Sequence, residues 1–216
     1  MTDPASVDPM SAARPLPAPV DPSTMDHFVY LRVDWRGYQQ LLAMRGESSV
    51  PRITYLEGLA ELMSPSRYHE IDKKCFARLL EAWSEIADVP LEGYGSWTLE
   101  DEQADRGAEA DECYTVRRVA KSDEDRPDIA IEVVWTSGGI NKLEVYRKLG
   151  VREVWFYNRG KLRFFALRRE DGDDVYREIA RSELLPELPI DVLLACMKEP
   201  DQTPAVRALR AALAAS

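Results

Sequence analysis

Cysteine and histidine are both scarce in this chain of 216 residues. Its three cysteines, Cys75, Cys113 and Cys196, lie far apart and never form a CxxC pair. This spacing fits reduced thiols in the cytoplasm better than a disulfide framework or a zinc site. With His27 and His69 as its only histidines, the chain has too few imidazoles for a histidine-rich metal site.

Basic side chains are outnumbered. Lys and Arg number 28 against 38 Asp and Glu, which gives a formal net charge of -10. A chain this acidic repels polyanions at long range, so general coating of nucleic acid is disfavoured. A local basic cleft, or a metal ion held in an acidic pocket, stays compatible with this balance.

Long apolar runs are missing as well, and no segment reaches the length that spans a bilayer, so no membrane association is expected. Hydrophobic residues make up 45% and charged residues 31%, which is typical of a globular chain with one core. The first 26 residues carry six of the 14 prolines. We therefore expect a flexible tail over residues 1–26, one domain over 27–200 and a helical extension over 201–216.

Local patterns predict the order of helices and strands. Asp34 caps a helical pattern that ends at Gly46, and a hairpin with its turn at Glu57-Gly58 follows. A strand, a helix and a strand after residue 127 predict a parallel pair joined by a right-handed crossover. The expected elements are a helix over 66–87, strands within 91–100, 107–116 and 128–135, a helix within 140–150, strands within 152–158, 161–169 and 174–180, and helices after Pro186.

The stretch RPDIAIEVVW, residues 126–135, places Glu132 in a strand that is apolar on both faces. A buried carboxylate without a partner is costly or gives up its charge. Asp111, in EADECY, can lie opposite Glu132 if its strand pairs antiparallel with this one, with Cβ atoms about 5 Å apart. Two carboxylates this close need a cation, and a hard divalent ion such as Mg²⁺ is a candidate.

Two further residues near this strand bear on its chemistry. Lys142, near the start of the next helix, could reach the same place and orient water or offset phosphate charge. Asp128 lies roughly 13 Å from Glu132 along the strand, so it is expected to support the loop rather than share an ion. A buried structural pair of Glu132 with Lys142, and a solvated strand-edge role for Asp111, are the alternatives without chemistry.

Four segments in order carry a family resemblance: YLEGLAELMSPSRYHE, GAEADECY, RPDIAIEVVWTSGG and KLEVYRKLGVREVWFY. With them the chain resembles the PD-(D/E)XK nuclease superfamily and, within it, the Uma-type restriction endonucleases. The resemblance implies an α/β, restriction-endonuclease-like fold with a mixed central β-sheet flanked by helices. It also implies a DNA endonuclease that uses Mg²⁺ or Mn²⁺, with Asp111, Glu132 and Lys142 as catalytic residues and the two carboxylates as metal ligands.

The chain departs from the superfamily pattern at two positions. The usual lysine two residues after the glutamate is Val134 here, and in the Uma group the lysine lies on the next helix, which Lys142 matches. Ala110 replaces the proline that usually precedes the first acidic residue. His69 matches a histidine of the group at this helix start, although a solvent-facing role is the simpler interpretation, and Glu57 is a further supporting candidate.

The resemblance also suggests a homodimer, because a duplex has two strands to cut. The run Trp155 to Tyr157 is expected in the core or at the dimer contact rather than stacked on bases. The alternatives are a catalytically silent binding or assembly protein, favoured by the net acidity, and a phosphodiesterase acting on RNA or a small phosphate ester. Repulsion between unpaired carboxylates predicts that Asp111→Asn leaves the metal-free fold intact or slightly more stable.

Overall fold

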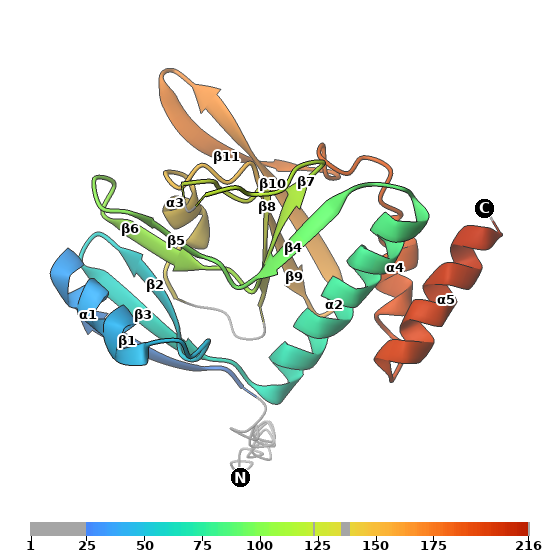
Figure 1. The fold of residues 1–216 in the computed structure, drawn as a ribbon, viewed down its shortest axis with the longest axis horizontal. Coiled ribbons are helices and arrows are strands. Elements are labelled where there is room, and N and C mark those ends of the chain that lie inside the picture. The colour runs from blue at the N-terminus through green and yellow to red at the C-terminus, as the bar shows by residue number, and fades with distance from the viewer. Residues whose placement is uncertain (1–24, 123, 135–138, 216) are drawn as a thin grey trace, which may run out of the picture.

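The computed structural model describes residues 25–122, 124–134 and 139–215. Within them, the strands form two sheets and five helices lie around these sheets (Figure 1). The expected α/β class, with a mixed sheet flanked by helices, is confirmed, and an antiparallel second sheet accompanies it. The tail expected over residues 1–26 lies outside the described residues except for Met25 and Asp26, and Asp26 is buried.

The elements follow one another as β1 (His27–Arg32), α1 (Trp35–Arg45), β2 (Arg52–Leu56), β3 (Leu59–Ser64), α2 (Arg67–Ile86), β4 (Leu91–Gly95), β5 (Thr98–Asp101), β6 (Arg106–Glu109), β7 (Glu112–Val116), β8 (Ile129–Val133), α3 (Lys142–Tyr146), β9 (Glu153–Asn158), β10 (Lys161–Glu170), β11 (Asp173–Ile179), α4 (Ile190–Cys196) and α5 (Gln202–Ala214).

Local capping and turn signals account for the N-terminal elements. The Asp34 side chain accepts a hydrogen bond from the Gly37 N–H at 2.8 Å and caps α1, and Gly46 ends the helix with φ 61°. Glu57 and Gly58 turn the β2–β3 hairpin with φ values of 46° and 88°, where glycine carries no steric penalty. The sequence predicted each of these features.

The six-stranded sheet has the order β11-β10-β9-β8-β7-β4. Strands β8 and β9 pair in parallel and are joined through α3, as expected of the strand, helix and strand in this region. All other neighbours in the sheet are antiparallel, including β7 and β8. The predicted parallel pair is confirmed, and the antiparallel pairing on which the argument for Asp111 and Glu132 depended is present.

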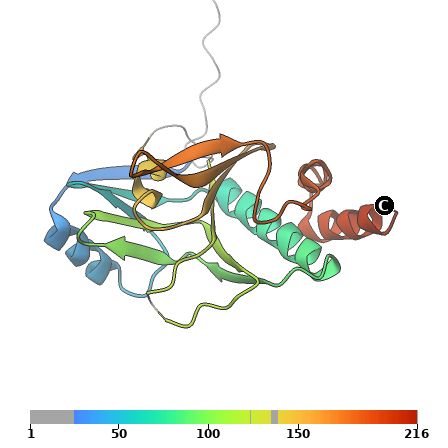
Figure 2. The same cartoon turned by 90° about the horizontal axis from the view of Figure 1, so that it is seen from above.

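The two faces of β8 pack in different hydrophobic clusters. Ile129, Ile131 and Val133 join the cluster formed with α2, α4 and α5, and Figure 2 shows these three helices together at one end of the molecule, away from α1. Ala130, with the opposite orientation, packs in the cluster that includes α3 and β6. Glu132 shares the parity of Ala130, so its side chain points toward α3 and the second sheet.

The second sheet has the order β1-β3-β2-β6-β5 and is antiparallel throughout. The single strands predicted within 91–100 and 107–116 are wrong in this respect, because each segment forms two strands that belong to different sheets. The chain passes from one sheet to the other at residues 96–97 and 110–111. Asp111 therefore lies at a crossing between the sheets and not in the middle of a strand.

The predicted C-terminal helix is present as α5, and Ala205 and Leu209 bury its inner face in the core shared with α2. It packs on the domain as an integral layer. Among the described residues, no helix combines the length and the apolar character that crossing a bilayer requires.

Candidate active site

Asp111 and Glu132 are brought together by the pairing of β7 with β8. The register sets Glu112 opposite Ile131, so Asp111 and Glu132 are the next residues beyond this pair on the two strands. Both carboxylates are buried, with 1% and 4% of their surface exposed. The Val133 N–H donates to Asp111 Oδ2 at 2.6 Å, which ties Asp111 directly to the end of β8.

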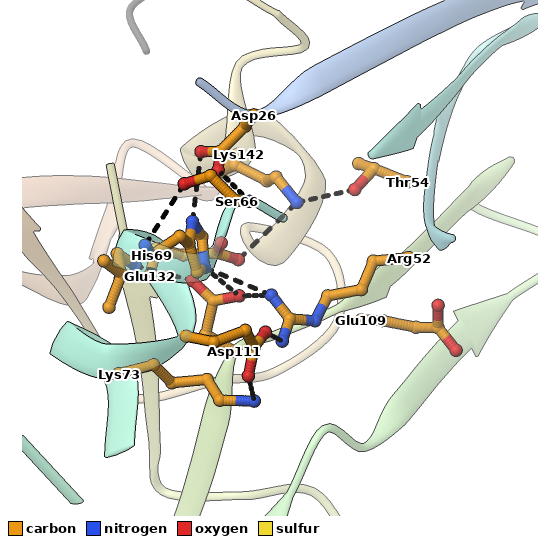
Figure 3. Close-up of polar contacts among 12 residues, drawn as sticks. Asp26, Arg52, Thr54, Ser66, His69, Lys73, Glu109, Asp111, Glu132 and Lys142 are labelled. Atoms are coloured by element: carbon orange, nitrogen blue, oxygen red, sulfur yellow. Dashed lines mark hydrogen bonds and ion pairs between the residues drawn. The ribbon is translucent and has the colours of Figure 1, made fainter. Parts of the chain in front are cut away.

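Helix α3 presents two side chains to Glu132. Lys142 Nζ lies 3.7 Å from Glu132 Oε1 and donates to Thr54 Oγ1 at 2.6 Å, and the Tyr146 hydroxyl donates to Glu132 Oε1 at 2.5 Å. Lys142 and Tyr146 are four residues apart, so they share one helix face. The structure thus places Lys142 beside the carboxylate pair, between β8 and β2 of the second sheet (Figure 3).

Glu132 has a raised pKa. Burial disfavours its charged form, and the neighbouring Asp111 carboxylate adds to this effect, while the Lys142 ammonium and the Tyr146 hydroxyl oppose it. The opposing contacts do not fully offset the burial. Glu132 is therefore the carboxyl group of this site that most readily accepts a proton.

Asp111 is held by two cationic side chains. Arg52 Nη1 donates to Asp111 Oδ1, and His69 Nε2 lies 3.0 Å from the same oxygen. Burial alone would raise the pKa of Asp111, but the Arg52 guanidinium and the His69 ring outweigh it and hold the pKa well below its usual range. Arg52 also donates through Nη2 to Glu70 Oε1 at 2.8 Å. In the sequence, no pattern singles out Arg52.

His69 is buried between two carboxylates, so the solvent-facing interpretation is wrong. Its Nδ1 lies 3.1 Å from Asp26 Oδ2, and the Ser66 N–H donates to Asp26 Oδ1 at 2.7 Å. Burial lowers the pKa of His69, but the hydrogen bonds to Asp111 and Asp26 outweigh burial and raise it from 6.5 to about 9. The raised pKa favours the imidazolium form at neutral pH against the Arg52 guanidinium, whose Nη1 lies 3.2 Å from His69 Nε2, and Figure 3 shows His69 between the two acids.

This raised pKa predicts how stability depends on pH in the metal-free protein. Because the folded-state pKa exceeds the unfolded one, the stabilisation from His69 is complete below about pH 6.5 and is lost as pH rises through about 9. The expected loss is roughly 3 kcal/mol at most, from a shift of this size. Urea unfolding with chelator across this range measures it. His69→Gln should flatten the dependence, and an unchanged slope in that variant would contradict the assignment.

The two remaining candidates lie elsewhere. Asp128, at the start of β8, accepts hydrogen bonds from the Val116 N–H at 2.9 Å and from Arg118 Nε at 3.0 Å, so it holds the loop between β7 and β8. Glu57 sits in the β2–β3 turn and pairs with Arg106 at 2.9 Å. The structure brings neither residue to the pair of Asp111 and Glu132.

A cavity of about 370 Å³ opens beside Glu132 and Lys142. Asp26 and Glu61 line another part of its wall, and Glu61 is fixed there because its Oε2 accepts a hydrogen bond from the Ile140 N–H at 2.9 Å. The rest of the wall is largely apolar: Phe28, Met63, Val133, Val134, Ile140, Leu143, Phe156 and Phe165. Glu132 is thus reached from a partly apolar pocket.

The donor chemistry of the site suits a hard divalent cation. Asp111 and Glu132 offer carboxylate oxygens, and Mg²⁺ is commonly bound by one or two carboxylates while it keeps several waters. No cluster of three or more His, Cys, Asp or Glu side chains suited to a metal occurs in the described part of the chain. Arg52 now occupies Asp111 Oδ1, so a metal ion at this oxygen would have to compete with the guanidinium.

Comparison with known proteins gives a family and a similar fold. The family model described as "Uma2: Putative restriction endonuclease" matches residues 35–196. The crystal structure of a putative nuclease belonging to DUF820 from Anabaena variabilis ATCC 29413 is similar at 11% identity and a TM-score of 0.46, over 77% of this chain and 96% of that chain. No curated protein matches. The matched range of the family model runs from α1 to the end of α4 and contains every residue of the candidate site except Asp26.

Proposed function

The chain belongs to the family described as Uma2 putative restriction endonucleases, and on this basis we propose that it is a divalent-metal-dependent DNA endonuclease. One observation carries the proposal. The buried pair of Asp111 and Glu132, on adjacent strands, has the Lys142 ammonium 3.7 Å from Glu132 Oε1 at the edge of a cavity. Two carboxylates can hold a divalent ion that activates water, and a nearby ammonium can offset charge on the phosphate.

In this mechanism Asp111 and Glu132 would hold Mg²⁺ or Mn²⁺. A bound ion of this kind makes water a better nucleophile and polarises a phosphoryl oxygen. Tyr146 fixes the position of Glu132 by donating to Oε1, and Thr54 fixes the Lys142 ammonium by accepting its hydrogen bond. Lys142 then offsets negative charge on the phosphate as it develops in the transition state.

A catalytically silent member that binds or assembles is the second candidate, and one observation favours it. Arg52 and His69 neutralise the charge of Asp111, so this carboxylate does not need a metal ion to balance its charge. The net charge of -10 points the same way, because it opposes a DNA substrate at long range.

Incubation of the pure protein with supercoiled plasmid separates these two candidates. We expect nicking or linearisation with Mg²⁺ or Mn²⁺ and none with chelator, because the carboxylates need the ion to act on a phosphate. A gel of the plasmid forms over time is the measurement. Plasmid that is bound but intact with every divalent metal would show that the protein is a catalytically silent member. Cleavage of RNA as fast as that of DNA would show that the substrate is not restricted to DNA.

The proposal also includes a cytoplasmic location and a homodimer. The three cysteines are buried free thiols, as in a protein of the reducing cytoplasm. A homodimer would present two centres to the two strands of a duplex. Trp155 is fully buried against Phe76 and Phe164, so it cannot form the dimer contact suggested for the aromatic run. Sedimentation at micromolar concentration measures the association state.

A further inference from the structure

A groove of about 460 Å³ lies at the carboxyl ends of the parallel strands β8 and β9. Six described residues line it: Val134, Phe156, Asn158, Arg159, Lys161 and Arg163. Three of them are cations, and none of the six is acidic. In a chain whose net charge is -10, this concentration of one sign marks the groove as a local site for anions.

The groove is continuous with the cavity of the candidate active site. Val134, Phe156 and Arg163 line both, and the cavity extends from them to Glu132 and Lys142. A polyanion that follows the cations of the groove is therefore led to Glu132 and Lys142. Crevices at the carboxyl ends of parallel strands are also where open α/β sheets bind ligands.

Phe156 adds an aromatic surface to this path. Its neighbours Trp155 and Tyr157 face the core and are buried, with 0% and 4% exposed, whereas Phe156 is only partly buried. Phe165 holds its ring in an edge-to-face contact, with centroids 5.6 Å apart. Phe28 and Phe165 line the cavity beyond it. The expectation that this run does not stack on bases therefore holds for two of its three members and is open for Phe156.

Basic side chains that follow a groove, combined with an aromatic ring, form the usual binding surface for single-stranded nucleic acid. Bases within a duplex are stacked on one another and cannot offer a face to Phe156. Arg163 now pairs with Glu178 at 2.8 Å on the surface, with 59% of its side chain exposed. The two side chains share two parallel hydrogen bonds of 2.8 Å, and because a phosphate offers the same pair of acceptor oxygens, it can replace Glu178 as the partner.

We propose that this groove binds a single-stranded segment of nucleic acid. Its phosphates contact Arg159, Lys161 and Arg163, and one base stacks on Phe156. The inference rests on the proposed nuclease function in one respect, which is that the bound strand runs from the groove toward Lys142. It names unpaired nucleic acid as the form that the site accepts. Binding itself needs no metal and no cleavage.

The test measures binding in chelator, by fluorescence anisotropy, of a labelled single-stranded oligonucleotide and of its blunt duplex. We expect the single strand to bind the more tightly. Lys161→Ala removes one phosphate contact, so the slope of log affinity against log salt should fall by about 0.7. Phe156→Leu keeps apolar contact with Phe165 and should weaken binding about fivefold or more. Lys198→Ala, an exposed lysine just beyond α4, is the matched control and should bind like the wild type.

Melting curves establish that each variant is folded, and Lys161 is exposed, so its replacement should leave the melting temperature unchanged. Tighter binding of the duplex, or wild-type binding by both folded variants, would overturn the groove assignment. Single-strand binding that depends on Lys161 and Phe156, in a protein that cleaves neither plasmid nor the single-stranded oligonucleotide with Mg²⁺ or Mn²⁺, would support the groove and refute the nuclease. Plasmid cleavage that is unaffected in both variants would support the nuclease function and refute the role of this groove.

Discussion

Asp111→Asn and Glu132→Gln should both abolish metal-dependent cleavage, yet only Asp111→Asn should unfold readily without metal. Asp111 balances the Arg52 guanidinium and the His69 imidazolium, and all three groups are buried. Removing one partner of a buried ion pair costs about 3–5 kcal/mol. Glu70 stays with Arg52 at 2.8 Å, so the lower end of that range is expected.

Glu132→Gln is the matched comparison. The raised pKa of Glu132 means that the fold already disfavours its charge, since burial and Asp111 outweigh the Lys142 pair. A neutral glutamine can still accept from Tyr146, so stability should stay within about 1 kcal/mol of the wild type or rise. Urea unfolding in chelator and plasmid cleavage with Mg²⁺ measure both properties. Equal stability losses in the two variants would refute this charge assignment.

The stability effect of Asp111→Asn reverses the expectation drawn from the sequence. That expectation treated Asp111 and Glu132 as two carboxylates in need of a cation, which would repel one another in the metal-free protein. The structure supplies the cations from the protein itself. Arg52, on β2, and His69, on α2, converge on Asp111, and Figure 3 shows both beside its carboxylate.

Lys142→Ala should lower turnover by about a hundredfold or more, on the order of 3 kcal/mol in the barrier, if its ammonium offsets phosphate charge. Metal affinity should change little or rise, because a cation beside the two carboxylates is removed. Tyr146 continues to donate to Glu132, so the fold should lose little stability. Single-turnover cleavage, metal titration and melting of this one variant measure the three effects.

Lys148→Ala is the control for Lys142, because Lys148 is exposed two residues beyond α3 and should be dispensable. Strong destabilisation of Lys142→Ala with unchanged turnover per folded molecule would show a structural pair with Glu132. Full turnover by Lys142→Ala would show that another lysine offsets the phosphate charge. Lys73 is the next candidate, since it lies on α2 and pairs with Glu70 at 2.8 Å, next to Arg52.

Features that depend on neighbours along the chain could be predicted from the order of the residues alone. The cap of α1 by Asp34, the turn at Glu57 and Gly58 and the alternation around Glu132 are all set by residues within a few positions of one another. The pairing of β7 with β8 also followed, because strands consecutive in the sequence tend to be neighbours. Asp111, Glu132 and Lys142 could therefore be named together in advance.

The surroundings of those residues depend on contacts between distant parts of the chain. Arg52 meets Asp111 across 59 positions of the chain, and Lys142 meets Thr54 across 88, because the two sheets face one another at the site. Asp26, which contacts His69, lies at the end of the stretch whose proline content predicted a flexible tail. Net charge is a sum over the whole chain, whereas a groove depends on which charges the fold places side by side. For this reason the acidic sequence gave no sign of the basic path beside Phe156.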